Sequence, residues 1–568
     1  MPASLSSPPA PPFTRSTRDE RVASLGDQEF DVVVIGGGIT GAGIVRDAAL
    51  RGLRVAQFET KDLAAGTSSA SSKLVHGGLR YLEQRKVGLV VESVTERARL
   101  EILAPHLVRP MPFVFPVYGK KPRPLWMVGL GLWIYEVLAL FRVPRRHETL
   151  GRRAAAETFP YLNTDALDGG VLYWDCATDD ARLVLETAIS AHEGGAWILP
   201  RTRVTGFLTE RTHIQGVTVR DELTGAEHTV RSRVVVNATG PWTDRTLGLR
   251  RQQARMMRPT KGTHIVLKRD RLPIEATIML WTGGDGFIFA IPADERVFVG
   301  TTDSDYSGDY DAVRATGDEV GFFLEQLNHS FPGAALTADD VLGTWAGLRP
   351  LLAAAEDEDT REVSREHTVR FDDDGLITIA GGKLTTYRLM AAEVVDAVAE
   401  RLRGEGLHVG RCPTGAVLLP GAAGVERRKG VLRSMGKEGR ALEDAARAEF
   451  GDDVLDHLLR TYGGRWPRVV ERARADERLG QRIDAELPYL WAEVDHAVEE
   501  EMAMTVEDVL RRRTQVMLRA DDLGLAAAPD VAARMAHHLG WSREEIGRQL
   551  DAYEDAVRLA IAWRDELA

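Results

Sequence analysis

The sequence predicts an α/β dinucleotide-binding domain built in two parts, with an antiparallel sheet that carries a substrate pocket, followed by an all-α C-terminal domain. Three observations support this prediction. Residues 31–59 read as strand, glycine turn, helix and strand. Residues 256–370 alternate apolar and polar side chains, as antiparallel strands do. Beyond residue 410, Leu, Val and Ala recur at helical spacing among charged residues.

We therefore divide the chain into an N-terminal extension (1–29), a binding domain (30–410, with the substrate sheet mainly at 256–370) and a helical domain (411–568). With 568 residues, 44% of them hydrophobic, each of the two large domains can bury its own core. The extension begins MPASLSSPPAPP, and such proline-rich polar sequence buries too little surface to offset ordering entropy. We predict that it is disordered and is not a targeting signal.

Composition also excludes several classes of function. Two cysteines are too few for a disulfide framework or a cysteine-rich metal site, so we predict no metal and a reducing, cytoplasmic location. The net charge of −12 argues against nucleic-acid binding, because a phosphate backbone requires a basic surface.

The first strand, residues 32–35, ends in a glycine motif of the G-x-G-x-x-G type. The first glycine permits the tight turn, the second lets the backbone approach a pyrophosphate, and the third lets the helix pack on the strand. The helix N-terminus offers unpaired N–H groups to phosphate, and an acid at the end of the second strand suits a ribose diol. We predict dinucleotide binding by Gly36, Gly38, Ile39, Thr40, Gly41, Glu59 and Thr60; a plain packing turn is the alternative.

The next segment, residues 61–83, is dense in Gly, Ser and Thr. Small hydroxyl side chains can approach a cofactor closely, and the Gly77–Gly78 pair frees the backbone near a flat ring. A solvated loop is the alternative. The candidate binding residues here are Thr67, Ser68, Ser69, Ser72, Lys73, Leu74, His76 and Gly77.

Several motifs in a fixed order give the chain a family resemblance. They are GTSSASSKLVHGGLRYLE, DDARLVLETA, NATGPW, KGTHIV, GTTDSDY, GLRPL, GGKLTTYR and the C-terminal YLWAEVDHAVEEEMAMTVEDVLRRRTQ. Together with the Gly36 turn, this set resembles the FAD-dependent (aerobic, respiratory) glycerol-3-phosphate dehydrogenases over residues 30–525. The resemblance implies a two-part FAD-binding domain of the glutathione-reductase/D-amino-acid-oxidase type.

The same resemblance implies oxidation of sn-glycerol 3-phosphate to dihydroxyacetone phosphate by hydride transfer to FAD. Electrons would pass to a membrane quinone, and the enzyme would lie peripherally on the cytoplasmic face of the cell membrane. Three alternatives stay open: an oxidase that uses O₂, a flavin amine oxidase of the glycine or D-amino-acid type, and a non-catalytic flavin sensor.

Two further turns are candidates for FAD contacts. NATGPW follows the strand Val234–Val236, and such a turn beside the Gly36 motif favours a flavin dinucleotide. ITIAGGKLTTYR combines a strand, a glycine turn and a helix start, and its backbone N–H groups and lysine suit the flavin's pyrimidine edge. The candidates are Ala238, Thr239, Gly240, Trp242, Gly382, Lys383, Leu384 and Thr385.

Oxidation of an alcohol phosphate requires a proton acceptor and cations. His264, between two apolar runs, is the candidate acceptor or orienting donor, although a lone histidine in a strand is more often structural. The resemblance places Arg349 and Arg365 on the phosphate and hydroxyl side of the site. The full set of candidate catalytic residues is His264, Arg349, Arg365, Lys383 and Arg80.

Residues 125–141 contain one charged side chain, Glu136, and have basic residues on both sides. Seventeen residues are short for a bilayer span of about 20. We expect either a helix that lies in the interface of an anionic membrane or a helix buried in the core. For the helical domain we expect a role in dimerisation or in support of the membrane face.

Overall fold

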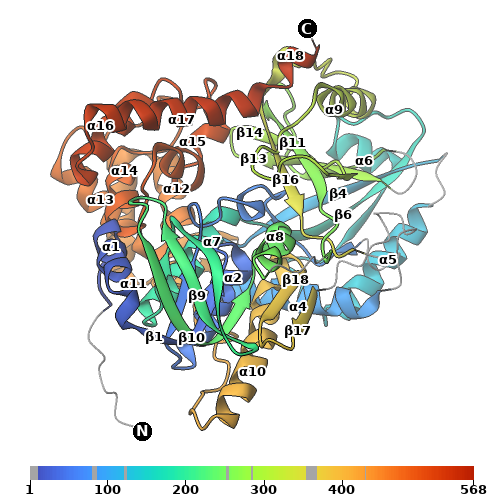
Figure 1. Cartoon of the computed structure of the whole chain (residues 1–568). Coiled ribbons are helices and arrows are strands. Elements are labelled where there is room, and N and C mark those ends of the chain that lie inside the picture. Colours follow the sequence, from blue (N-terminus) through green and yellow to red (C-terminus); the bar gives the residue numbers. More distant parts are fainter. Residues whose placement is uncertain are drawn as a thin grey trace.

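The computed structural model describes residues 10–79, 86–119, 124–250, 255–282, 286–353, 367–428 and 430–567. Two β-sheets lie side by side, and most of the C-terminal helices lie above the first of them (Figure 1). In this view the first sheet is at the lower left, the second is at the right, and the helical unit lies along the upper left.

The first sheet is the predicted dinucleotide-binding sheet. Its order is β17-β18-β10-β1-β2-β7, with β8 and β9 continuing beside β10. The central strands β18, β10, β1, β2 and β7 are parallel. The strand bounds are β1 Glu29–Ile35, β2 Val55–Phe58, β7 Trp197–Leu199, β8 Thr202–Glu210, β9 His213–Asp221, β10 Glu227–Asn237, β17 His367–Phe371 and β18 Ile377–Gly381.

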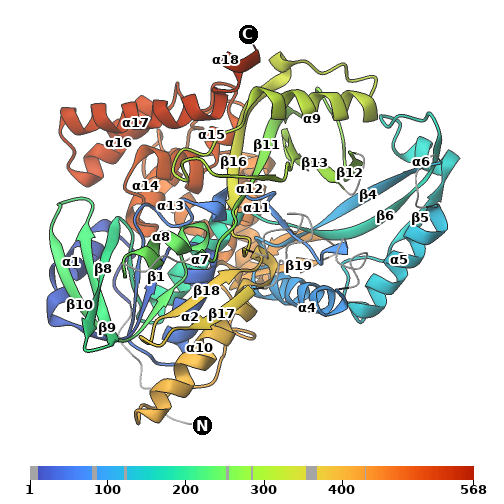
Figure 2. The same ribbon diagram turned by 45° about the vertical axis from the view of Figure 1, so that its right-hand side comes forward.

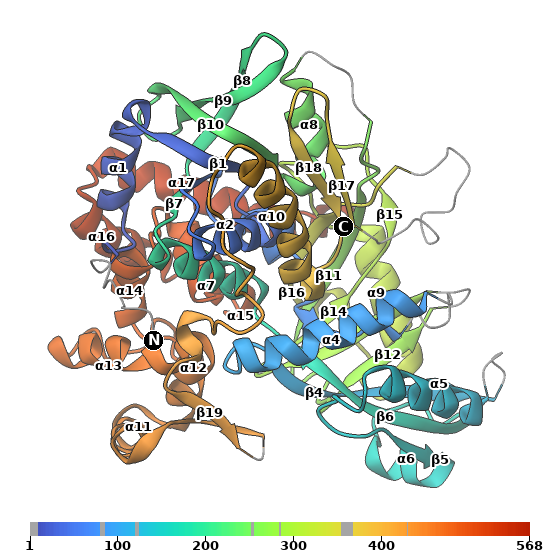
Figure 3. The same cartoon turned by 90° about the horizontal axis from the view of Figure 1, so that it is seen from below.

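Three helices cover one face of this sheet: α2 (Ile39–Leu50), α7 (Asp180–Glu193) and α10 (Tyr387–Gly404). Seen from below, they lie in front of the strands (Figure 3). Helix α7 begins at Asp180 after an Asp179 cap, as the acids at that point of the sequence predict. The apolar sides of these helices and of β1 and β10 form one continuous core. This packing places the first turn of α2 directly beyond the end of β1.

The second sheet has the order β15-β11-β14-β13-β12-β4-β6-β3, with β16 beside β11 and β5 beside β6. It is mainly antiparallel and extends beyond the predicted range 256–370, because residues 74–177 also contribute strands. The bounds are β3 Leu74–Val75, β4 Arg109–Tyr118, β5 Glu148–Gly151, β6 Leu167–Ala177, β11 Thr260–Lys268, β12 Thr277–Trp281, β13 Phe287–Ala293, β14 Arg296–Gly300, β15 Ser304–Asp305 and β16 Val341–Arg349.

Helices α4 (Val87–Leu103) and α5 (Leu125–Leu138) pack against strands β4 and β6 at the edge of the molecule (Figure 2). Helix α5 has one buried side, as expected of a core helix, and one exposed apolar side, as expected of an interfacial helix. Leu132 and Tyr135 are buried, whereas Trp126 is 67% exposed and Trp133 is 51% exposed. No helix in the described residues is both long and apolar enough to cross a membrane.

The prediction that residues 1–29 are disordered is wrong for residues 10–29. Helix α1 (Arg15–Ala23) follows a Thr14 cap, and Phe13 is buried in the core. Arg18 is also buried, and its guanidinium donates to Pro200 O at 3.1 Å and pairs with Asp221. These acceptors are more than 180 residues away in the sequence, so the local composition could not indicate this order. Residues 1–9 lie outside the described residues.

The C-terminal unit is helical, as predicted, with one small hairpin, β19 (Val425–Arg428) and β20 (Val431–Ser434). It has its own core, which includes Trp466 and Tyr462. Its helices are α11 Gly436–Phe450, α12 Asp452–Tyr462, α13 Trp466–Ala475, α14 Ala492–Glu500, α15 Val516–Arg519, α16 Ala528–Leu539, α17 Arg543–Ile561 and α18 Arg564–Leu567.

Candidate active site

A cavity of about 1420 Å³ lies where the two sheets and the C-terminal unit meet. Its volume exceeds the roughly 300–1,000 Å³ of a pocket for one drug-sized ligand. The cavity runs from the glycine turn after β1 to strands β11 and β16 of the second sheet. It therefore has room for a dinucleotide and a small substrate together.

The glycine turn forms a cradle that side chains would fill. At Gly36, where φ is +114°, a Cβ atom would lie 2.6 Å from Ala238 O. At Gly41 it would lie 2.1 Å from Gly36 O, so this glycine serves close packing of α2, as predicted. Gly38, Ile39 and Thr40 line the cavity at the N-terminus of α2. The residues present thus fit the pyrophosphate of FAD.

Glu59 stands at the end of β2, as the motif predicts, and lines the cavity with Thr60. Its carboxylate accepts hydrogen bonds from Gly37 N at 2.7 Å and Lys61 N at 2.8 Å. Burial raises the pKa of Glu59, although these two bonds act in the opposite direction. The carboxylate therefore holds the glycine turn and remains within reach of a ribose.

The hydroxyl-rich segment connects the cradle to the second sheet. Ser68 Oγ accepts a hydrogen bond from Ile39 N at 3.0 Å. Thr67 Oγ1 donates to Leu348 O at 2.7 Å. Thr67, Ser68, Ser72, Leu74 and His76 all line the cavity. This segment is therefore a wall of the site and not a solvated loop.

The opposite wall consists of the other two predicted turns. Ala238, Thr239, Gly240 and Trp242 line the cavity after β10, and Gly382, Lys383, Leu384 and Thr385 line it after β18. Gly381 and Gly382 both have positive φ, +80° and +86°. The two walls meet where His76 N donates to Thr385 Oγ1 at 3.2 Å. The glycine turn, the hydroxyl-rich segment and these two turns thus surround one cavity.

His264 occupies the substrate end of the cavity, on β11 between β14 and β16. Its imidazole is 2% exposed and stacks on Trp345, with ring centroids 4.7 Å apart and planes 7° apart. On its other neighbouring strand, a Cβ at Gly300 would lie 2.1 Å from His264 Cδ2. Nε2 lies 2.8 Å from Ser72 Oγ. The ring is thus held in one orientation.

Burial, then the positive charges of Arg349 and Lys73, lower the pKa of His264 well below its usual value. A proton acceptor must be neutral, and a histidine is neutral above its pKa. We therefore expect kcat to show no loss from protonation of His264 between about pH 7.5 and 6. The measurement is kcat against pH at saturating substrate, which avoids titration of the substrate phosphate near pH 6. A decrease centred near pH 6.5 that His264→Phe abolishes would contradict this prediction.

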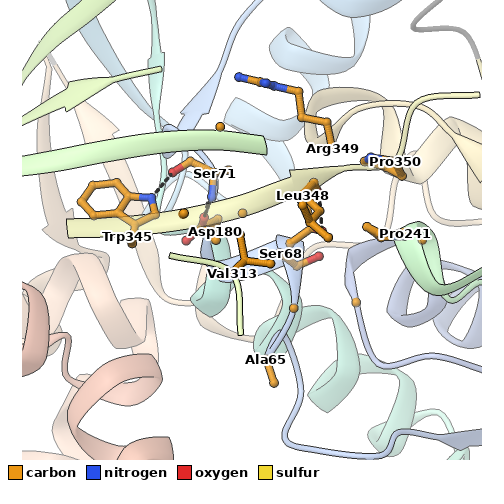
Figure 4. A pocket seen from close by; sticks show the side chains of 18 of the residues that line it. Ala65, Ser68, Ser71, Asp180, Pro241, Val313, Trp345, Leu348, Arg349 and Pro350 are labelled. Carbon is orange, nitrogen blue, oxygen red and sulfur yellow. Dashed lines mark hydrogen bonds between the residues drawn. The ribbon is translucent and has the colours of Figure 1, made fainter. Parts of the chain in front are cut away.

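Arg349 ends strand β16 and lines the same part of the cavity (Figure 4). Its Nη1 donates to Asp303 Oδ1 at 2.9 Å, and its Nη2 donates to Thr301 Oγ1 at 3.0 Å and Thr302 O at 2.8 Å. These contacts hold the guanidinium in place. Arg349 also lowers the pKa of His264, so its charge acts directly on the candidate proton acceptor.

Some predicted residues lie elsewhere. Lys73 is a predicted cofactor ligand, but it is 7% exposed, and its ammonium donates to Asp180 Oδ1 at 2.6 Å and to Ser69 O at 3.4 Å. Like Lys73, Ser69 and Gly77 do not line the cavity; Ser69 Oγ donates to Gly66 O, and Gly77 N donates to Asp175. These three residues support the walls from behind. Arg80 and Arg365 lie outside the described residues.

Other residues of the site were missed. Trp345 Nε1 donates to Ser71 O at 3.2 Å, and Ser71 Oγ donates to Asp180 Oδ2 at 2.7 Å (Figure 4). Asp180 lies within the DDARLVLETA motif but is not among the predicted site residues. Asp303 lies within GTTDSDY, a motif that the sequence already identified. The position of Trp345 just before GLRPL, and that of Asp303 within GTTDSDY, could have indicated that both belong to the site.

Comparison with known proteins agrees with this geometry. A family model for FAD dependent oxidoreductases matches residues 31–397, and one for the C-terminal domain of alpha-glycerophosphate oxidase matches residues 412–546. A glycerol-3-phosphate dehydrogenase of Mycobacterium leprae is 39% identical over 542 residues, which are 94% of this chain and 89% of the relative. An aerobic glycerol-3-phosphate dehydrogenase of Bacillus subtilis is 36% identical over 88% of this chain and 90% of the relative.

Among solved structures, glycerol-3-phosphate dehydrogenase from Bacillus halodurans complexed with FAD matches with a TM-score of 0.78 and 33% identity. The match covers 97% of this chain and 98% of that one. The predicted fold class, family and cofactor are confirmed. The chain belongs to the FAD-dependent oxidoreductases and, within them, to the glycerol-3-phosphate dehydrogenase family.

Proposed function

We propose that this enzyme oxidises sn-glycerol 3-phosphate to dihydroxyacetone phosphate with FAD as its cofactor. The observation that carries the proposal is the position of a buried, neutral histidine and a held arginine at the far end of the dinucleotide cavity. Relatives named glycerol-3-phosphate dehydrogenase, with 34–40% identity over most of the chain, support the choice of substrate.

The chain's own residues can perform the protein's part of the reaction. His264 takes the proton of the substrate hydroxyl at Nε2, where Ser72 Oγ is its hydrogen-bond partner at 2.8 Å. Arg349 stabilises the negative charge of the phosphate or of the developing alkoxide. Lys383, on the other wall, would add positive charge near the pyrimidine edge of a bound flavin. Bound FAD would supply the acceptor for the hydride that leaves the carbon bearing that hydroxyl. Arg80 and Arg365 remain candidates for further phosphate contacts.

We also propose that residues 30–410 form the oxidoreductase domain and residues 411–568 a second domain. Family matches that end at 397 and begin again at 412 support this division. A homodimer remains a prediction.

The proposal is tested by incubating the purified holoenzyme with sn-glycerol 3-phosphate and an electron acceptor, and measuring dihydroxyacetone phosphate. Glycine and D-alanine serve as substrates for the amine-oxidase alternative. We expect product from the glycerol phosphate alone. Turnover of an amine without turnover of the phosphate would refute the proposal. Comparing a soluble quinone with O₂ as oxidant identifies the acceptor, for which we propose a membrane quinone.

The exposed side of α5 supports peripheral membrane binding at the cytoplasmic face. Trp126, Leu130, Trp133 and Val137 are all at least 48% exposed on one helix. Aromatic and apolar side chains of this kind insert into the boundary between headgroups and acyl chains. Arg142, Arg145 and Arg146 follow the helix and can contact anionic headgroups. The basic residues that precede the helix lie outside the described residues.

Replacing Trp126 and Trp133 with Glu should reduce binding to anionic vesicles at least about tenfold, because each Trp loses about 1.5–3 kcal/mol of apolar burial. Flotation with vesicles of phosphatidylglycerol and phosphatidylcholine measures the effect. Phe371→Glu is the matched control, since Phe371 is 60% exposed on β17 of the other sheet. Equal flotation of the Trp variant and the control variant would remove α5 as the contact surface.

A further inference from the structure

One of the segments through which the C-terminal domain reaches the cavity is a short turn that precedes α15. Residues Asp508–Arg513 form a π-helical turn, η8, between α14 and α15. Glu507, Arg511 and Arg512 line the cavity together with Glu59 and Arg201 of the first domain. Figure 1 shows α14 and α15 lying over the first sheet. Single π-helical turns are rare in proteins and are often found at functional sites.

Two arginines of η8 hold a single carboxylate of the dinucleotide-binding domain. Asp62 Oδ2 accepts from Arg512 Nε at 2.8 Å and from Arg513 Nη1 at 2.7 Å. Its Oδ1 accepts from Arg513 Nη2 at 3.0 Å. All three side chains are at most 3% exposed. Removing one partner from such a buried cluster leaves a charge without compensation, which is strongly unfavourable.

Asp62 lies in the loop that carries the ribose-binding acid. Before it, Glu59 accepts a hydrogen bond from Gly37 N at 2.7 Å. After it, Ala64 N donates back to Gly37 O at 3.0 Å. The loop thus contacts the glycine turn twice, once on each side of Asp62. Any displacement of Asp62 must move Glu59, Gly37 or both.

Arg201 connects the same cluster to the next strand. Its backbone N donates to Lys61 O at 2.9 Å, and its Nη2 donates to Asp508 Oδ1 at 2.7 Å. Arg512 Nη1 donates to Glu507 Oε1 at 2.9 Å. Arg511 Nη1 donates to the same Glu507 oxygen at 3.0 Å. Three acids, Asp62, Glu507 and Asp508, therefore pair with four arginines. Burial opposes the charged forms, but the neighbouring carboxylates raise the pKa of Arg512 and the neighbouring arginines lower the pKa of Asp508, so these two side chains stay charged in the working pH range.

We propose that the C-terminal domain completes the adenosine end of the dinucleotide site. Arg512 and Arg513 are positioning residues: they hold Asp62, and Asp62 keeps Glu59 and Gly37 in the geometry that a bound ribose diol requires. This gives the domain a role in cofactor binding in addition to its expected structural roles. The inference rests on the FAD-binding part of the proposed function and not on the substrate.

The test measures nucleotide binding to full-length apoprotein by calorimetry, with FAD and with ADP, which carries the adenosine end alone. The variants are Asp62→Asn and Arg513→Met. Arg296→Met is the matched control: Arg296 is also a buried arginine between the domains, with Nε donating to Arg519 O at 2.6 Å, but it does not line the cavity. We expect Kd for both FAD and ADP to rise at least about tenfold in the two variants and to stay at the wild-type value in the control.

The double variant Asp62→Leu and Arg513→Met covers the case in which a single variant does not fold, because apolar replacement of a buried pair is tolerated better than loss of one partner. It should fold and still bind ADP weakly. Folded variants that bind ADP as tightly as the wild type would overturn the inference. Failure of the wild type itself to bind FAD would instead count against the proposed function.

Discussion

His264→Phe should lower kcat on sn-glycerol 3-phosphate by about 10²–10⁴-fold, the usual contribution of a general base. Phenylalanine keeps a flat ring against Trp345, with which His264 now stacks at 4.7 Å, and a similar volume above Gly300. It removes both ring nitrogens. The glycine cradle and the hydroxyl-rich wall are unchanged, so the variant should retain its FAD. The loss therefore belongs to proton transfer and not to cofactor binding.

The measurement is kcat at saturating substrate with a dye acceptor, divided by the bound flavin. Ser72→Ala is the informative companion, because Ser72 Oγ is the one partner of His264 Nε2 that the described residues show. We expect a smaller loss in that variant. A His264→Phe enzyme with wild-type kcat would assign the histidine a packing role only.

Arg349→Met should lower kcat/KM by roughly 30- to 4000-fold, which corresponds to the 2–5 kcal/mol that removing one partner costs when bound substrate buries the charge pair. The guanidinium is 22% exposed as a side chain and is held by Asp303, Thr301 and Thr302. Its loss removes the cation from the substrate end of the cavity. Because several contacts orient the planar group, Arg349→Lys should recover little of the activity.

Steady-state kinetics over a range of substrate concentrations separates the effects on kcat and KM. Arg245→Met is the control, since Arg245 also lines the cavity but is 50% exposed and pairs with Asp311. A control variant as inactive as Arg349→Met would mean that net charge, and not the position of Arg349, governs turnover. An active Arg349→Met enzyme would exclude the proposed phosphate or alkoxide role.

The dinucleotide cradle was predictable because its requirements are local. Gly36, Gly38 and Gly41 lie within six residues, and backbone geometry alone determines which of them tolerates a side chain. The position of Glu59 was predictable because only one helix and one strand separate it from the glycine turn. The remaining turns, after β10 and β18, required the family resemblance, because a glycine turn does not by itself indicate which strand ends lie together.

What could not be predicted depends on contacts between distant parts of the chain. The sequence predicts Lys73 as a cofactor ligand because nothing near it reveals its partner, Asp180, 107 residues away. Asp62 meets Arg512 across 450 residues, so nothing near Asp62 indicated a link to the C-terminal domain. Arg18 similarly gains its acceptors only after folding. In each case a charged residue, of a kind that commonly binds ligands or faces solvent, is buried by a partner that local sequence does not reveal.

The measurement that tests the central claim most directly is an anaerobic titration of the purified, flavin-containing enzyme with sn-glycerol 3-phosphate. The visible absorbance of the oxidised flavin should bleach as the flavin accepts the hydride. Wild-type enzyme should bleach in one turnover, and His264→Phe should bleach far more slowly. A flavin that stays oxidised in the wild type after excess substrate would contradict the assignment of this cavity to glycerol-3-phosphate oxidation.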